Sequence, residues 1–266
     1  MSKQIEKYED RVVIFLDILG FKELVQKSHN NDEHIDKIKT AIKLIRKAYG
    51  KLNKNQERMI TQFSDSIIVS FLIKEKGEVA YLLSKTQLLL KKLIMIDIVC
   101  RGGIAKGNLI HNHTLIFGQA LIDAYEAESK IALYPRVILT KSIIDLGIEN
   151  YGYHPANDAD YESAEINSFL SIDFDGFYYI DYFKTETFFE LSMIDNIYLN
   201  KLYSFIANQL NLNVSKPYVK QKYEWMKSKY NDQVQKVLFN NRVTNEGFEL
   251  GSSKKSKIYK NIKPLN

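Results

Sequence analysis

The order of predicted strands and helices is the feature of this sequence that most constrains its fold. Residues 11–17, RVVIFLD, are apolar and rich in β-branched side chains, and they predict a buried strand that ends in a carboxylate. The following patterns predict, in order, a helix at 32–49, strands at 57–63 and 66–72, a helix near 78–96, a strand through 98–104, a short apolar piece at 115–118, a helix near 118–131 and a strand at 136–140. An antiparallel or mixed sheet with helices packed on one face satisfies this order, so we expect an α+β fold, an α/β sandwich.

Composition places the chain among folded soluble proteins. With 266 residues it is long enough for one large domain or two modest ones. Hydrophobic residues make up 45 % and charged residues 26 %, which excludes collagen, a disordered acidic tail and a membrane bundle. The net charge of +5 is too mild to argue for nucleic acid as a partner.

The distribution of charge suggests a domain organisation. Residues 216–266 contain 12 Lys and Arg against 4 Asp and Glu, whereas residues 1–215 contain 25 against 28. We therefore predict a main domain over 1–165, a strand and helix extension over 166–215, and a basic helical segment over 216–266 that includes a tail, GSSKKSK.

Three features favour a cytoplasmic location without a membrane partner. The single cysteine, Cys100, cannot form an internal disulfide, which fits a reducing compartment. The N-terminal residues MSKQIEKYEDR carry charges where a signal peptide needs an apolar run. No stretch reaches the roughly 18 apolar residues that a transmembrane helix requires.

Two aspartates are the leading candidates for chemistry. Asp17 ends the first predicted strand, and Asp65 lies at the tip of the predicted hairpin. Two carboxylates at the edge of one sheet could hold one or two divalent cations, which prefer hard oxygen ligands. Gly20 follows closely and would let backbone amides turn toward an anion. The alternative is that Asp17 caps a helix and Asp65 is an ordinary turn residue.

Four segments in order strengthen the first interpretation. VVIFLDILGFKELV, QFSDSIIVSF, CRGGIAKGNLIH and FGQALIDAYEAES together resemble the catalytic domain of class III nucleotidyl cyclases, and most closely the pyrimidine cyclases of Pycsar antiphage systems. The resemblance covers about residues 11–140, with a weaker similarity through 173–183 and 222–231. It implies a ferredoxin-type βααββαβ sheet followed by a mainly helical C-terminal extension, with residues 1–165 as the catalytic domain.

The resemblance also implies roles for individual residues. Asp17 and Asp65 match the two metal-binding aspartates, with the carbonyl of Ile18 as a backbone ligand, and two Mn²⁺ or Mg²⁺ ions per site are implied. Gly20 and Phe21 lie in the turn that holds the triphosphate. The ribose 3′-hydroxyl would then attack the α-phosphorus, releasing pyrophosphate and forming a 3′,5′-cyclic nucleotide.

The sequence departs from the family at the groups that stabilise the transition state. Where the family has an Asn and an Arg on the helix after FG, this chain has Ile122 and Glu126, which cannot donate in that way. Arg101 or Lys106 could supply the positive charge instead, or the site is inactive. The alternatives are that Arg101 is a surface arginine at a strand end and Lys106 a solvated lysine.

The positions that recognise the nucleotide base in the family also differ in this chain. They fall on Thr61 and Leu115, which disfavours an ordinary adenylate or guanylate cyclase. The Thr61 hydroxyl could bond a pyrimidine edge, or Thr61 could simply be a β-former in a half-buried strand. His111 and His113 fall in a predicted turn and are poor evidence for zinc, and Cys100 is expected to be a small buried residue.

The resulting hypothesis is a pyrimidine nucleotide cyclase, with UTP as substrate favoured over CTP. The resemblance implies a homodimer with active sites across the interface, and a product that signals to a separate cyclic-nucleotide-responsive effector in antiphage defence. One alternative is a cyclase-like fold that binds nucleotide without turning it over. Another is a nucleic-acid-binding module that uses the basic C-terminal segment.

Overall fold

A computed structural model describes residues 7–50, 58–74, 76–152, 159–185, 192–245 and 262–266. Contacts divide the chain into two compact units, Met1–Asp181 and Tyr182–Asn266. The strands all belong to the first unit, which also carries Asp17 and Asp65. Among the described residues, no helix combines the length and the apolar character needed to cross a bilayer.

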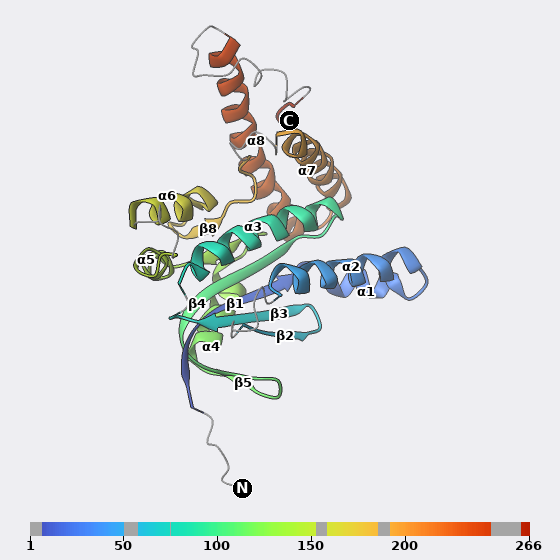
Figure 1. Ribbon diagram of the computed structural model, residues 1–266. Helices are drawn as coiled ribbons and strands as arrows, with labels where there is room; N and C mark the ends of the chain where they lie inside the picture. The colour runs from blue at the N-terminus through green and yellow to red at the C-terminus, as the bar shows by residue number, and fades with distance from the viewer. Residues whose placement is uncertain (1–6, 51–57, 75, 153–158, 186–191, 246–261) are drawn as a thin grey trace. The chain divides into compact units, whose positions relative to one another are not determined.

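The first unit begins with the βααββαβ order that the resemblance implies (Figure 1). Its elements are β1 (Glu9–Ile18), α1 (Phe21–Ser28), α2 (Asp32–Ala48), β2 (Met59–Phe63), β3 (Ser66–Leu72), α3 (Glu78–Met95) and β4 (Cys100–His111). They are followed by β5 (Ile116–Phe117), α4 (Gln119–Glu126), the π-helix η1 (Ala127–Ile131), β6 (Val137–Leu139), α5 (Lys141–Glu149), α6 (Ala159–Phe169), β7 (Leu170–Ile172) and β8 (Tyr178–Ile180). The predicted α+β class is confirmed.

The strands form a mixed sheet with β1 near its centre. Their order is β2-β3-β1-β4-β6-β8-β7, and β5 pairs with β4 off this path. The neighbours pair antiparallel except for β4 and β6, which are parallel. β1 is hydrogen-bonded on both sides, and its residues 11–16 are all buried, which explains why its sequence is a continuous apolar run instead of an alternating one.

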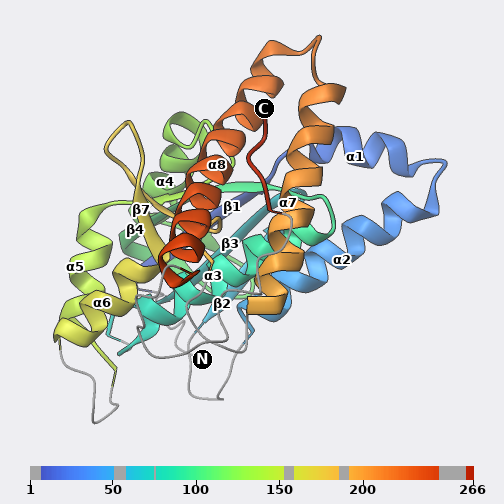
Figure 2. The same ribbon diagram turned by 90° about the horizontal axis from the view of Figure 1, so that it is seen from above.

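Helices cover both faces of this sheet. Val13 and Phe15 of β1 pack with Ala120 and Ala124 of α4 in one buried cluster. Alternation along β1 directs the neighbouring residues, such as Ile14, to the other face, where Figures 1 and 2 show α3. The expectation of helices on one face is therefore incomplete, because β1 is apolar on both faces and each needs a cover.

The second unit is mainly helical. It contains α7 (Ser192–Leu212) and α8 (Pro217–Asn245), whose aromatic and aliphatic side chains form a buried core. Phe183 stacks on Tyr182 at 4.4 Å between ring centroids and meets Trp225 of α8 edge-on at 5.7 Å. Near the C-terminus, the amide of Leu265 donates to the Asn231 side chain at 2.8 Å. Residues 246–261, which include the predicted tail GSSKKSK, lie outside the described residues.

Candidate functional site

The sheet brings Asp17 and Asp65 to the same edge. Asp17 is the ninth residue of β1 and pairs with Ser66, the first residue of β3. Asp65 lies immediately before Ser66 in the β2–β3 turn, whose other residue, Ser64, has a positive φ of 55°. The Ile18 amide donates to the Asp65 carbonyl at 3.2 Å, so the turn that carries Asp65 is fixed against the end of β1.

The same hydrogen bond orients the carbonyl of Ile18. In a strand, the N–H and C=O of one residue point to the same side, so the Ile18 carbonyl faces the β2–β3 turn. Asp17, Asp65 and this carbonyl could together supply only oxygen donors, of the kind that Mg²⁺ and Mn²⁺ prefer. In the described part of the chain, no three His, Cys, Asp or Glu side chains are grouped so that they could hold a metal ion.

A basic side chain lies between Asp17 and a buried glutamate. Arg101 pairs with Asp17 in the β1–β4 register, and its Nε is 3.4 Å from Asp17 Oδ2. The same Nε is 2.5 Å from Oε1 of Glu128 in η1. The Glu128 side chain is 3 % exposed, whereas those of Arg101 and Asp17 are 23 % and 18 % exposed. The structure thus places Arg101 beside Asp17, as a phosphate-facing role requires.

Gly103 allows η1 to come close enough for this contact. A Cβ at Gly103 would lie 2.4 Å from the Ala124 carbonyl oxygen and 3.0 Å from the Glu128 amide nitrogen. The end of α4 and the start of η1 therefore rest directly on the β4 backbone. Sequence reasoning missed Glu128, although Ala120, Ala124 and Glu128 recur every four residues and mark it as a carboxylate on the buried face of a helix.

The turn after β1 leads into a helix N-terminus that no side chain caps. Gly20 has φ 76° and precedes α1, a conformation that glycine adopts without strain. No side chain caps this helix N-terminus, and the first intrahelical bond runs from the Leu24 amide to the Gly20 carbonyl. The first-turn amides, beginning at Phe21, therefore lack intrahelical acceptors and could bind an anion such as a triphosphate.

Thr61 belongs to a chain of polar side chains that crosses the sheet. Its Oγ1 is 2.9 Å from Nε2 of His111, whose Nδ1 is 2.8 Å from Ser70 Oγ. Arg11 Nη1 donates to the same Ser70 oxygen at 3.2 Å. His111 is the last residue of β4 and is buried, so its predicted position in a turn is wrong: the strand continues further than its sequence pattern indicated. Burial, together with the charge of Arg11, lowers the pKa of His111 to about 4.

Register separates Lys106 from the carboxylates. Lys106 pairs with Val12, whereas Arg101 pairs with Asp17. Positions 101 and 106 differ by an odd number, so their side chains lie on opposite faces of the sheet. The structure therefore brings Arg101 to the candidate site and does not bring Lys106 there.

The remaining residues considered from the sequence lie on the surface, except for Cys100, which lies in the core. Ile122 is 51 % exposed on α4, and Glu126 forms an exposed ion pair with Lys130 at 2.6 Å. Leu115 is 47 % exposed. Cys100 is buried, as expected, and burial raises the pKa of its thiol.

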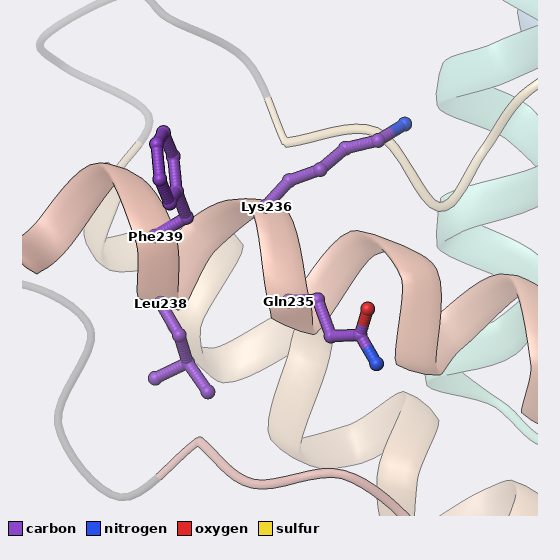
Figure 3. Close-up of a pocket in the computed structure, with 4 residues that line it drawn as sticks. All are labelled: Gln235, Lys236, Leu238 and Phe239. Atoms are coloured by element: carbon purple, nitrogen blue, oxygen red, sulfur yellow. The ribbon is translucent and has the colours of Figure 1, made fainter.

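A surface hollow of about 460 Å³ occurs in the second unit (Figure 3). It is lined by Gln235, Lys236, Leu238 and Phe239, all on α8, and Figure 3 shows these side chains spreading from different sides of the helix. Among the described residues that line it, none is an acid.

Comparisons with known proteins gave matches in structure alone. No family model and no curated protein sequence matches the chain. Among solved structures, the adenylyl cyclase CyaB from P. aeruginosa is similar with 16 % identity and a TM-score of 0.46, covering 68 % of this chain and 97 % of that one. A bacterial light-regulated adenylyl cyclase is similar with 12 % identity and a TM-score of 0.41, covering 61 % and 59 %. Neither likeness is strong enough to carry a function from those proteins to this chain.

Proposed function

We propose that this protein is a metal-dependent nucleotidyl cyclase that converts a pyrimidine nucleoside triphosphate into its 3′,5′-cyclic monophosphate and pyrophosphate. The observation that carries the proposal is the convergence of Asp17 and Asp65, which the Ile18–Asp65 hydrogen bond fixes at one sheet edge. The cyclase-like segments quoted above supply these same two aspartates. A structural turn would not need two partly exposed carboxylates beside an uncapped helix N-terminus.

Each residue of the site has a distinct task in this reaction. Asp17, Asp65 and the Ile18 carbonyl would hold divalent cations, which offset phosphate charge and favour ionisation of the attacking hydroxyl. The first-turn amides of α1 would bind the triphosphate oxygens, with Gly20 permitting the turn. The ribose 3′-oxygen bonds to the α-phosphorus and loses its proton to solvent, and the bond from the α-phosphorus to the bridging oxygen breaks.

Arg101 is the side chain best placed to stabilise the charge that develops on the α-phosphate. It lies beside Asp17, on the sheet face that α4 covers, and it is partly exposed. A planar guanidinium can donate two hydrogen bonds to phosphate oxygens. It would compensate for Ile122 and Glu126, which stand where related cyclases carry donors.

The substrate base is the finer part of the proposal. We favour UTP over CTP because the segments most closely resemble pyrimidine cyclases. Thr61 lies on the same sheet face as Asp17, since it pairs with Ile68, which in turn pairs with Phe15. Its hydroxyl is neutral and could bond a pyrimidine edge once its contact with His111 rearranges. We further propose a cytoplasmic homodimer whose product activates a separate effector in antiphage defence.

The decisive experiment is a product assay. The pure protein is incubated with each of the four common nucleoside triphosphates and Mn²⁺, and the products are identified by mass spectrometry. We expect a cyclic pyrimidine nucleotide, and its loss by about a hundredfold or more in Asp17→Ala and Asp65→Ala. Asp36→Ala is a matched control, because Asp36 is a 79 % exposed carboxylate on α2. Absence of any cyclic nucleotide, or full activity in both site variants, would overturn the proposal.

A second candidate is a nucleotide-binding module without turnover. The observation that favours it is the exposed pair Ile122 and Glu126, neither of which can donate to a phosphate. This alternative predicts that nucleotide binds without added metal and that no pyrophosphate is released. Calorimetric titration with and without Mn²⁺, run beside the product assay, separates it from the cyclase.

A further inference from the structure

We propose that Glu128 is a positioning residue, which competes with Asp17 for the Arg101 guanidinium and so weakens the hold of Arg101 on the carboxylate that a divalent cation would bind. The inference rests on the proposed function, because it concerns the same metal site. It assigns a role to a side chain that touches neither substrate nor metal. That role is exerted entirely through Arg101.

The distances show which carboxylate holds the arginine more closely. Arg101 Nε is 2.5 Å from Glu128 Oε1, and it donates a longer hydrogen bond of 3.4 Å to Asp17 Oδ2. Glu128 is also the more deeply buried of the two acids, and an ion pair is screened less in the protein interior than at the surface. Without Glu128, Asp17 would be the remaining carboxylate at Arg101 and would attract the guanidinium. The existing hydrogen bond to Asp17 would then shorten, and a cation would have to compete with the guanidinium for that carboxylate.

The backbone of η1 and of β4 holds Glu128 close to Arg101. η1 is a π-helix, a rare element that often occurs at functional sites, and it follows α4 directly. The bare backbone of Gly103 lets η1 reach β4, and Glu128 is the buried acidic residue of that turn. A purely structural ion pair between η1 and β4 would give the same distances. The two roles differ in what they predict for metal binding.

The test is Mn²⁺ affinity without nucleotide, measured by electron paramagnetic resonance of the free ion. We expect Glu128→Gln to weaken Mn²⁺ binding about tenfold, because Arg101 then pairs with Asp17 alone. The double variant Arg101→Gln with Glu128→Gln should bind Mn²⁺ at least as tightly as the wild type, since no guanidinium remains at Asp17. Asp123→Asn changes an exposed carboxylate on the preceding helix, α4, and should leave the affinity unchanged.

Each outcome decides something. Equal affinity in Glu128→Gln and wild type would overturn the positioning role while leaving the metal site intact. Weak binding in both Glu128→Gln and the double variant would show a structural role instead. A wild type that binds no Mn²⁺ would overturn the metal site itself, and with it both proposals. Melting curves check folding, and Glu128→Asp should restore part of the affinity where Glu128→Gln is unstable.

Discussion

His111 shows how one buried side chain can make the stability of the whole sheet depend on pH. Its two ring nitrogens bond Thr61 of β2 and Ser70 of β3, so it links strands that are distant in sequence. Both bonds suit a neutral ring, in which one nitrogen donates and the other accepts. A proton on His111 would add a second charge near Arg11, inside the protein.

We therefore predict that stability falls as the pH drops from about 6.5 toward 4. The folded-state pKa of about 4 lies below the ordinary value of 6.5, so the unfolded chain binds more protons across this window. The contribution of neutral His111 to the free energy of unfolding is fully present above pH 6.5. On the order of 3 kcal/mol of that free energy is lost by pH 4. Urea unfolding at several pH values measures it. His111→Gln should flatten the curve between pH 6.5 and 4.5, and an unchanged curve would contradict the assignment.

Arg136 is a second residue whose partners determine local stability. Its side chain is fully buried and donates to Asp173 and Asp175, which come just before β8. Asp173 is itself fully buried, whereas Asp175 is 27 % exposed. The Arg136–Asp173 ion pair therefore joins the segment before β6 to the β7–β8 turn by two fully buried charges, which water screens little.

We predict that Asp173→Ala destabilises the protein by about 3–5 kcal/mol, because it removes half of the compensation for a buried guanidinium. Asp175→Ala should cost less, since Asp175 is partly solvated. Denaturant unfolding of the two variants at neutral pH provides the comparison. Equal losses of unfolding free energy in the two variants would mean that the burial of the aspartate does not determine how much its removal destabilises the protein.

At the scale of elements, the packing of η1 and α4 on β4 depends on one glycine. A Cβ at Gly103 would lie 2.4 Å from the Ala124 carbonyl oxygen and 2.6 Å from the Ala127 side chain. Gly20 differs, because a Cβ there meets nothing within 4 Å and only its positive φ resists substitution.

We expect Gly103→Ala to cost about 1–3 kcal/mol through overpacking, and also to weaken Mn²⁺ binding, because η1 must move and carry Glu128 with it. Gly20→Ala should cost about 1–2 kcal/mol through backbone strain. Thermal melting together with the metal titration measures both effects. Intact Mn²⁺ affinity in a destabilised Gly103→Ala would show that η1 does not position Arg101.

The elements also show what the sequence could and could not predict. The run RVVIFLD predicted β1, and the hairpin around Asp65 followed from two apolar runs joined by a polar tip, because these signals are local. The helix predicted near 118–131 is instead α4 followed by a π-helix, a change that depends on contact with Gly103 of β4. The spacing of Glu128 with Ala120 and Ala124 marks it as buried, but its contact with Arg101 depends on the packing of η1 on β4.

Register sets a further limit on prediction. The alignment of β4 with β1 determines the sheet face on which Lys106 lies. The length of β4 determines whether His111 can reach Thr61. A shift of one residue would exchange the faces of every side chain on a strand. A single sequence does not fix that alignment. It predicted Asp17 and Asp65 as neighbours because Asp17 lies near the end of β1 and Asp65 lies in the turn of the hairpin beside it.

At the scale of the whole molecule, net charge says little about the candidate site. The excess of +5 arises from residues 216–266, whereas residues 1–215 carry more acidic than basic residues. Two acidic side chains at one sheet edge would repel a triphosphate until cations bind. If the proposed function holds, metal is needed for substrate binding as well as for chemistry, and we expect nucleotide affinity to rise with Mn²⁺ concentration.

Exposed apolar side chains on α4 and on the β4–β5 hairpin are consistent with the proposed homodimer. Ile122 and Tyr125 are about half exposed and lie three residues apart, on one face of α4. Leu115 and Phe117, near β5, are 47 % and 45 % exposed. Exposed apolar side chains that gather on one part of a surface are typical of interaction sites. It belongs to the helix that packs on the Asp17 face of the sheet, where a second copy could complete each active site.

We predict that the wild type is a dimer in solution and that the pair Ile122→Glu and Tyr125→Glu makes it a monomer. Carboxylates on both sides of a twofold contact repel each other and lose water on association. Light scattering after size-exclusion chromatography measures the mass, and the product assay should show activity falling with the dimer fraction. Ile172→Glu is the matched control, because Ile172 is 59 % exposed on β7, at the far edge of the sheet. A monomeric wild type with full activity would contradict the dimer, and would require each chain to bind and cyclise the nucleotide alone.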